Sequence, residues 1–170
     1  EKVRLDLDVF GQMLARSVFD YERPLIGLEI ELNLVDQDYQ PRMTNAEVLE
    51  RIADPAYQTE IGQYNIELNV NPRSLPGDAA IELESDLRLS LNRAEALASE
   101  TGAHIVAIGI LPTVTPEHLH ADAMSTNLRY VALNEAMVNA RGEDMFIDIE
   151  GTNGERLAMY ADSIAPESAC

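Results

Sequence analysis

The sequence predicts an α+β fold in which helices flank an antiparallel sheet. Two segments, residues 27–36 and 64–73, alternate aliphatic with polar side chains, which is the period of a strand that buries one face. One-sided strands of this kind are typical of antiparallel sheets. Helical and strand patterns mix along the chain without regular alternation, which favours α+β over a parallel α/β architecture.

The chain opens with a helical pattern that leads into the first of these strands. Apolar side chains recur at helical spacing over residues 3–20 and predict an amphipathic helix, which the segment 21–24 should break. The strand at 27–36 should end in a turn at 36–41, where DQDYQP gathers turn-forming residues. We therefore expect a hairpin or loop at this point.

A short helix should separate the two strands. Asn45 can cap a helix that runs to about Ile52, and Asp54 followed by Pro55 should stop it. The second strand, 64–73, comes soon afterwards. Because the two strands are close in sequence, we expect them to be neighbours in space.

A long helix and an apolar strand follow. Apolar residues spaced for burial predict a helix over 78–100, which Gly102 should end. The run AHIVAIGILP at 103–112 is nearly continuous in apolar residues, and its length and β-branched side chains suit a buried strand. His104, at its start, is expected to be a structural residue with a polar partner.

The last part of the chain should contain a loop, a helix and a hairpin. The segment 113–127 has the composition of a loop. Asn127 can cap a helix over 128–140, and Gly142 should end it. Alternating segments on either side of the turn at 152–154 predict a β-hairpin.

Length and composition fit one ordinary domain. A chain of 170 residues with 46% hydrophobic content can bury a core of its own. No apolar run approaches the roughly 18 to 20 residues needed to cross a bilayer, and the first residues lack the pattern of a signal peptide. We therefore expect a soluble, cytoplasmic protein without a membrane partner. The sequence does not indicate an oligomeric state.

The net charge of the chain limits the classes of molecule that it can bind. Thirty acidic and twelve basic residues give a net charge of −18, which opposes binding to nucleic acid. A nucleotide is compatible with this charge only if cations stand between its phosphates and the protein. The single cysteine, Cys170, cannot form an internal disulfide and is expected to be an ordinary thiol.

The polar faces of the two strands carry the candidate functional residues. If the aliphatic faces pack together, then Glu29, Glu31 and Glu67 share the other face, and Glu60 stands at the entrance of the second strand. No lysine or arginine occurs between Gly27 and Val35 or between Asn65 and Asn71. Close carboxylates repel each other unless a cation intervenes, so the pattern points to a divalent metal.

Other interpretations stay open at this point. The carboxylates can form an ordinary solvated face of a non-catalytic α+β domain, which binds metal weakly or serves in assembly. His118 and His120 could chelate zinc, but neither a cysteine nor a third histidine supports such a site nearby. Neither GxGxxG nor GxxxxGK[ST] occurs, so a nucleotide would be held without a glycine-rich phosphate loop.

The order of these motifs resembles the glutamate-cysteine ligase superfamily. The first strand carries G-L-E-I-E, an acidic residue precedes a second strand glutamate by seven positions, a long helix and an apolar strand follow, and an SxNxRY-like stretch comes last. The matching positions are Gly27, Glu29, Glu31, Glu60, Glu67, Ser125, Asn127, Arg129 and Tyr130.

The resemblance implies a glutamine-synthetase-like catalytic core whose curved antiparallel sheet holds Mg²⁺ and ATP. By this likeness Glu29, Glu31, Glu60 and Glu67 are metal ligands, and Tyr130 and Arg129 belong to the substrate pocket. The implied activity is ATP-dependent ligation of the side-chain carboxylate of glutamate to the amine of cysteine or a related amine. The resemblance also implies that residues 1–170 are the N-terminal part of one catalytic domain, with further nucleotide-binding residues beyond them.

Overall fold

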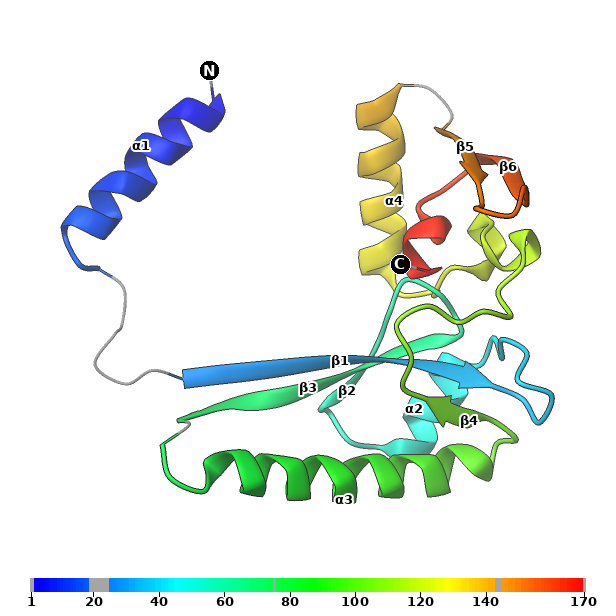
Figure 1. The fold of residues 1–170 in the computed structure, drawn as a ribbon, viewed down its shortest axis with the longest axis horizontal. Helices are drawn as coiled ribbons and strands as arrows, with labels where there is room; N and C mark the ends of the chain where they lie inside the picture. Colours follow the sequence, from blue (N-terminus) through cyan, green and yellow to red (C-terminus); the bar gives the residue numbers. More distant parts are fainter. Residues whose placement is uncertain (1, 19–24, 75, 143–144, 170) are drawn as a thin grey trace.

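The computed structural model describes residues 2–18, 25–74, 76–142 and 145–169 (Figure 1). Residues 21–24 and Cys170, for which a helix break and an ordinary thiol are expected, lie outside these ranges. The helices and strands are α1 (Lys2–Ala15), β1 (Leu25–Val35), α2 (Asn45–Ile52), β2 (Tyr57–Thr59), β3 (Asn65–Ser74), α3 (Ala79–Ser99), β4 (His104–Val106), α4 (Leu128–Arg141), β5 (Met145–Glu150) and β6 (Arg156–Ala161). Short 3₁₀ helices η1 (Pro116–His118), η2 (Ala121–Ala123) and η3 (Ala165–Ala169) complete the set.

An antiparallel sheet with the order β2-β3-β1-β4 forms the centre of the fold. Figure 1 shows α3 along one side of this sheet, and α4 with the β5–β6 hairpin on the other. The long pairing of β1 with β3 brings the two alternating segments together, as expected. The fold is therefore α+β with an antiparallel sheet flanked by helices, and the sequence-based prediction is confirmed.

The main core lies between the aliphatic face of the sheet and the helices α2 and α3. The strands contribute residues that are almost wholly buried, and each helix adds one side of its surface. Burial of this apolar area is the main force that holds the layers together. The buried residues of this core are Leu32, Leu34, Val48, Ile52, Tyr57, Ile66, Leu68, Ala94, Ala98 and Ala103.

Most elements match the predictions within one or two residues. Helix α3 spans Ala79–Ser99, and the hairpin of β5 and β6 forms around 152–154. Asn127 caps α4 as predicted, because its side-chain oxygen accepts a hydrogen bond from the Arg129 N–H at 3.0 Å. Gly142 ends the same helix with a φ of 72°, a left-handed value that favours glycine.

The prediction of a strand over 103–112 is wrong beyond Val106. Only His104–Val106 pairs with β1, and the chain then leaves the sheet, so that Ile110 is 64% exposed. The side-chain N–H of Asn33 donates to the Ile108 carbonyl at 3.0 Å, which occupies that carbonyl outside the strand ladder. Gly109 within the apolar run is a residue that weakens strands.

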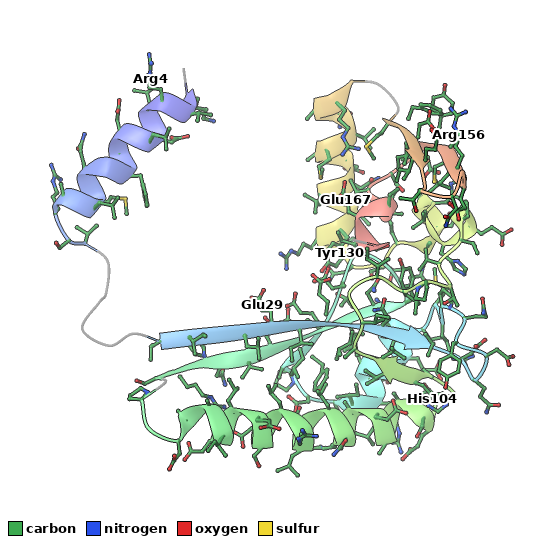
Figure 2. All side chains as sticks on the ribbon, in the orientation of Figure 1. Arg4, Glu29, His104, Tyr130, Arg156 and Glu167 are labelled. Atoms are coloured by element: carbon green, nitrogen blue, oxygen red, sulfur yellow. The ribbon has the colours of Figure 1, made fainter. Side chains whose placement is uncertain are left out.

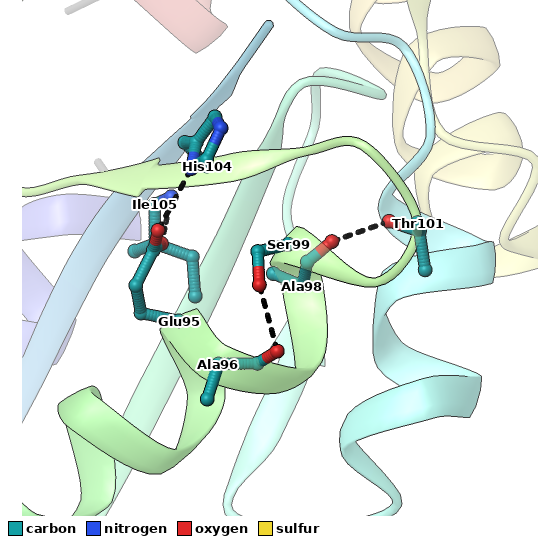
Figure 3. A network of polar contacts seen from close by, with 7 residues as sticks. All are labelled: Glu95, Ala96, Ala98, Ser99, Thr101, His104 and Ile105. Atoms are coloured by element: carbon teal, nitrogen blue, oxygen red, sulfur yellow. Dashed lines mark hydrogen bonds and ion pairs between the residues drawn. The ribbon is translucent and has the colours of Figure 1, made fainter. Parts of the chain in front are cut away.

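The short strand β4 is anchored by a carboxylate of α3 (Figure 3). Glu95 accepts hydrogen bonds from the Ile105 N–H at 2.6 Å and from His104 Nδ1 at 2.8 Å. The exposed edge of a sheet is thereby given a polar partner from a neighbouring helix. His104 is a partnered structural residue, as expected.

The first helix differs from the expectation in its end and its surroundings. It stops at Ala15 instead of residue 20, and Ser17 adopts a left-handed φ of 51° just after it. Figure 1 shows α1 standing away from the rest of the fold, and none of its residues is buried. Within the described ranges, no helix combines the length and apolar character that a bilayer-crossing segment requires.

Candidate functional site

The acidic face of the sheet is built from alternate residues of β1 and β3. Glu31 lies directly opposite Glu67, and Glu29 lies opposite Asn69. Figure 2 shows Glu29 on the side of the sheet that carries α4 and Tyr130, away from α3. The strands thus share one anionic face, as their alternation predicts.

Glu60 reaches this face from the loop that joins β2 to β3. Burial is the largest cause that raises its pKa to about 7, and a hydrogen bond with Glu67 and the charges of Glu67 and Glu31 act in the same direction. The Ile61 N–H, which donates to Glu60 at 3.1 Å, opposes the shift. The structure therefore places Glu60 close to Glu67 and within the field of Glu31.

The carboxylates of this face have no basic partner among the described residues. Within the described part of the chain, neither Glu31, Glu60 nor Glu67 forms an ion pair with a lysine or arginine. Arg73 lies on the same strand as Glu67 but pairs with Asp86 of α3 at 3.0 Å. The acidic face is therefore an uncompensated cluster that a cation would stabilise.

Tyr130 and Arg129 stand beside this cluster, at the start of α4. The Tyr130 hydroxyl donates to the Thr59 carbonyl at 2.7 Å. Burial is the main cause that raises the pKa of Tyr130, the charges of Glu60 and Glu67 add to it, and the charge of Arg129 opposes it. Arg129 is exposed and lies 5.8 Å from the centre of the Tyr130 ring.

Two open hollows adjoin the carboxylates on β1. One, of about 510 Å³, is lined by Gly27, Glu29, Asn69 and Asn71 among others. The second, of about 650 Å³, lies between Glu29–Glu31 of β1 and the segment 107–110 that leaves the sheet. The acidic face therefore borders space for a ligand. The sequence pattern missed the second hollow because it treated 107–110 as strand.

The oxygen donors of this face match the chemistry of Mg²⁺. Among the described residues, no three His, Cys, Asp or Glu side chains converge closely enough to hold one ion in common. Mg²⁺ is usually bound through one or two carboxylates, with water and substrate phosphates completing the shell. Glu60 and Glu67 are adjacent and neither pairs with a lysine or arginine among the described residues, so they fit this requirement, and the full set with Glu29 and Glu31 stays a prediction.

The two histidines considered for zinc are engaged separately. His118 Nδ1 lies 3.1 Å from the Thr115 backbone N–H, which donates to it. His120 Nδ1 lies 3.7 Å from a carboxylate oxygen of Asp162. Each ring thus has a separate partner: His118 contacts Thr115 of its own loop, and His120 faces Asp162, which directly follows β6.

Two buried residues near Glu60 were not recognised from the sequence as parts of the site. Asn45 was expected to cap α2, but Thr44 occupies the N-cap position and the Asn45 side chain is turned inward and 3% exposed. Its amide donates to Ser125 Oγ at 2.7 Å, across 80 positions of sequence. Ser125 belongs to the SxNxRY-like stretch, which was the signal that could have found this pair.

The fold and site define an α+β domain with a cluster of carboxylates on one face of its sheet. The sequence profile of glutamate-cysteine ligase family 2 matches residues 25–147, from the first residue of β1 into β5. The chain therefore belongs to glutamate-cysteine ligase family 2, which is a ligase-type enzyme family. Searches of curated proteins and of solved structures found no match.

Proposed function

We propose that this protein is an ATP-dependent ligase that joins the side-chain carboxylate of glutamate to the amine of cysteine or a related amine. The observation that carries the proposal is the uncompensated group of Glu31, Glu60 and Glu67 beside Tyr130. Repulsion within such a group destabilises the metal-free fold, and the metal ion of a metal-bound polyphosphate would relieve it. Membership of the ligase family supports the reaction class.

We assign the metal-holding role to Glu29, Glu31, Glu60 and Glu67. When bound, Mg²⁺ supplies neutralisation of the charge on the phosphate oxygens. The carboxylates act as ligands and not as general bases in this proposal. Glu67 has the central position among the carboxylates, because it faces Glu31 across the paired strands and also contacts Glu60, which lies on the loop between β2 and β3.

The reaction needs an activated carboxylate. A carboxylate is a poor acyl donor, so the γ-phosphoryl group of ATP first moves to the side-chain carboxylate of glutamate and leaves ADP. The amine then attacks the carbonyl carbon of the acyl phosphate, the bond from this carbon to the phosphate oxygen breaks, and phosphate and one proton of the amine are released as the amide forms. This chain orients the reactants on one rigid sheet face, which lowers the entropic part of the barrier. Tyr130 and Arg129 border that face on the side of α4 and are proposed to contact the substrates.

Calorimetry with the full-length protein tests the proposal. ATP should bind in the presence of Mg²⁺ and bind much more weakly in EDTA, and phosphate release should depend on both glutamate and an amine. Product analysis with candidate amines then identifies the acceptor. Mg²⁺ binding without any binding of ATP would contradict the ligase proposal and favour a non-catalytic acidic domain.

Arg129→Ala is expected to raise the KM for glutamate by about tenfold, because an anionic substrate that approaches the carboxylate cluster loses the cation beside Tyr130. The exposed position of Arg129 predicts little change in the free energy of unfolding. Steady-state kinetics checks the change. Arg88→Ala on the exposed side of α3 is the matched control, and an equal effect of both variants would exclude a local role for Arg129.

A further inference from the structure

The loop that carries Glu60 is held by an unusually complete set of hydrogen bonds from outside the sheet. Five consecutive carbonyls, those of residues 59–63, each accept a hydrogen bond from α2 or from the segment 125–130. Loops generally satisfy such groups with water. Here side chains and backbone from two remote segments take that place.

Ser125 holds the middle of the loop. Its hydroxyl donates to the Glu60 carbonyl, and its backbone N–H donates to the Ile61 carbonyl at 2.7 Å. Tyr130 continues the series through the Thr59 carbonyl at 2.7 Å, and the Asn127 amide donates to Thr59 Oγ1 at 3.2 Å. Three members of the SxNxRY-like stretch therefore contact the two residues at and before Glu60.

Asn45 holds the other end of the loop. Its backbone N–H donates to the Gln63 carbonyl at 2.9 Å, and its side-chain amide donates to the Gly62 carbonyl at 3.1 Å. The same amide donates to Ser125 Oγ, which orients the hydroxyl toward Glu60. Ser125 is 2% exposed, so water cannot replace this bond.

The loop has little room to adopt another path. A Cβ atom on Gly62 would come within 2.5 Å of Asn65 Oδ1 and 3.0 Å of the Tyr64 ring. The backbone is therefore packed closely at the residue that lies two positions after Glu60. The backbone of Glu60, and with it the base of its side chain, is therefore held in a fixed position relative to β3.

We infer that Ser125 and Asn45 are positioning residues, which fix the carbonyls of residues 60–63 so that the Glu60 carboxylate stays against Glu67. The inference rests on the proposed role of these carboxylates in binding Mg²⁺. Mg²⁺ demands near-ideal octahedral geometry, and groups that orient its ligands typically change metal affinity 10- to 100-fold when removed. The SxNxRY-like stretch thus serves the metal ligands as well as the substrate pocket.

Ser125→Ala in the full-length protein tests this inference, with Ser163→Ala as the matched control. Ser163 is also 2% exposed, and its hydroxyl accepts one hydrogen bond, from the Ala165 N–H at 3.2 Å, away from the loop. We expect Ser125→Ala to raise the Mg²⁺ concentration for half-maximal binding by about tenfold or more. Ser163→Ala should leave it within twofold of the wild type. Ser125→Cys keeps a similar shape with a weak thiol donor, so it gives the same test if the alanine variant does not fold.

Hydrogen–deuterium exchange of the metal-free proteins separates the possible outcomes. Faster exchange over 60–65 in Ser125→Ala, together with the weaker Mg²⁺ binding, supports the inference. Unchanged exchange, or faster exchange with wild-type Mg²⁺ binding, overturns it. If the wild type itself binds no Mg²⁺, the proposed function fails and the positioning role fails with it, whereas the exchange data still report whether the loop is held.

Discussion

Glu67→Gln is expected to lower kcat/KM for Mg²⁺-ATP by about a hundredfold to a thousandfold, the range found when one preorganised charge-stabilising group is removed from an active site. Glu67 faces Glu31 across the strands and contacts Glu60, so its loss weakens the part of the site that both neighbours share. An amide of the same shape keeps the packing but provides a neutral and weaker ligand. Steady-state ATP turnover over a range of Mg²⁺ concentrations measures the effect.

The same substitution should stabilise the metal-free protein. Like charges directly opposite each other in an antiparallel pair are destabilising by roughly 0.2–1 kcal/mol, and Glu67→Gln removes one such charge. We therefore expect the free energy of unfolding in EDTA to rise by about 0.5–1 kcal/mol while turnover falls. Urea denaturation with and without Mg²⁺ checks the sign, because added Mg²⁺ should favour the wild type.

Glu84→Gln on α3 is the control for both measurements. Glu84 is exposed and pairs with Arg88 at 2.8 Å within the same helix. Its substitution should leave turnover unchanged and alter stability by no more than about 0.5 kcal/mol. Turnover of Glu67→Gln within twofold of the wild type would contradict the assigned role, and so would an equal loss in both variants.

The strand pairing and the acidic face could be predicted because both follow from a period of two. In β1 and β3, an aliphatic residue at every second position fixes which side chains are buried, and a shift by one residue would expose them all. Glu29, Glu31 and Glu67 are therefore placed on one face by the pattern alone. Glu60 was noted from its place at the entrance of the second strand, the resemblance to a family position added it to the predicted metal ligands, and the structure brings it to Glu67.

The remaining features depend on contacts between distant segments. The pairing of Asn45 with Ser125 spans 80 positions, and no local pattern encodes it. Strand β2 has three residues, too few for an alternation to be recognised. The run 103–112 has the apolar composition and β-branched side chains of a strand, yet the chain leaves the sheet after Val106 and Asn33 binds the Ile108 carbonyl outside the ladder. Tertiary contacts override propensity at each of these points.

The stability of the metal-free protein should fall as the pH rises toward neutrality. Burial and the neighbouring Glu67 raise the pKa of Glu60 to about 7 in the folded protein, against 4.5 for an ordinary glutamate. Between these values the folded state holds a proton that the unfolded chain has released. The contribution of this proton to the free energy of unfolding is therefore complete below about pH 4.5 and lost as the pH passes about 7. Urea denaturation in EDTA between pH 5 and 8, compared with Glu60→Gln, isolates this part of the pH dependence.

Mg²⁺ binding should show the opposite dependence, since the metal competes with the proton on Glu60. Below the pKa of about 7, the apparent Mg²⁺ affinity should fall about tenfold per pH unit, because the ionised form becomes the minor one. Binding near pH 6 should release close to one proton, which calorimetry in buffers of different ionisation enthalpy measures. Glu60→Gln should bind Mg²⁺ more weakly and with a flat pH profile over this range. A wild-type affinity that is constant from pH 5.5 to 7.5 would mean that Glu60 is not a ligand. A protonated carboxylate must release its proton before it can bind Mg²⁺, and this release would make the affinity depend on pH.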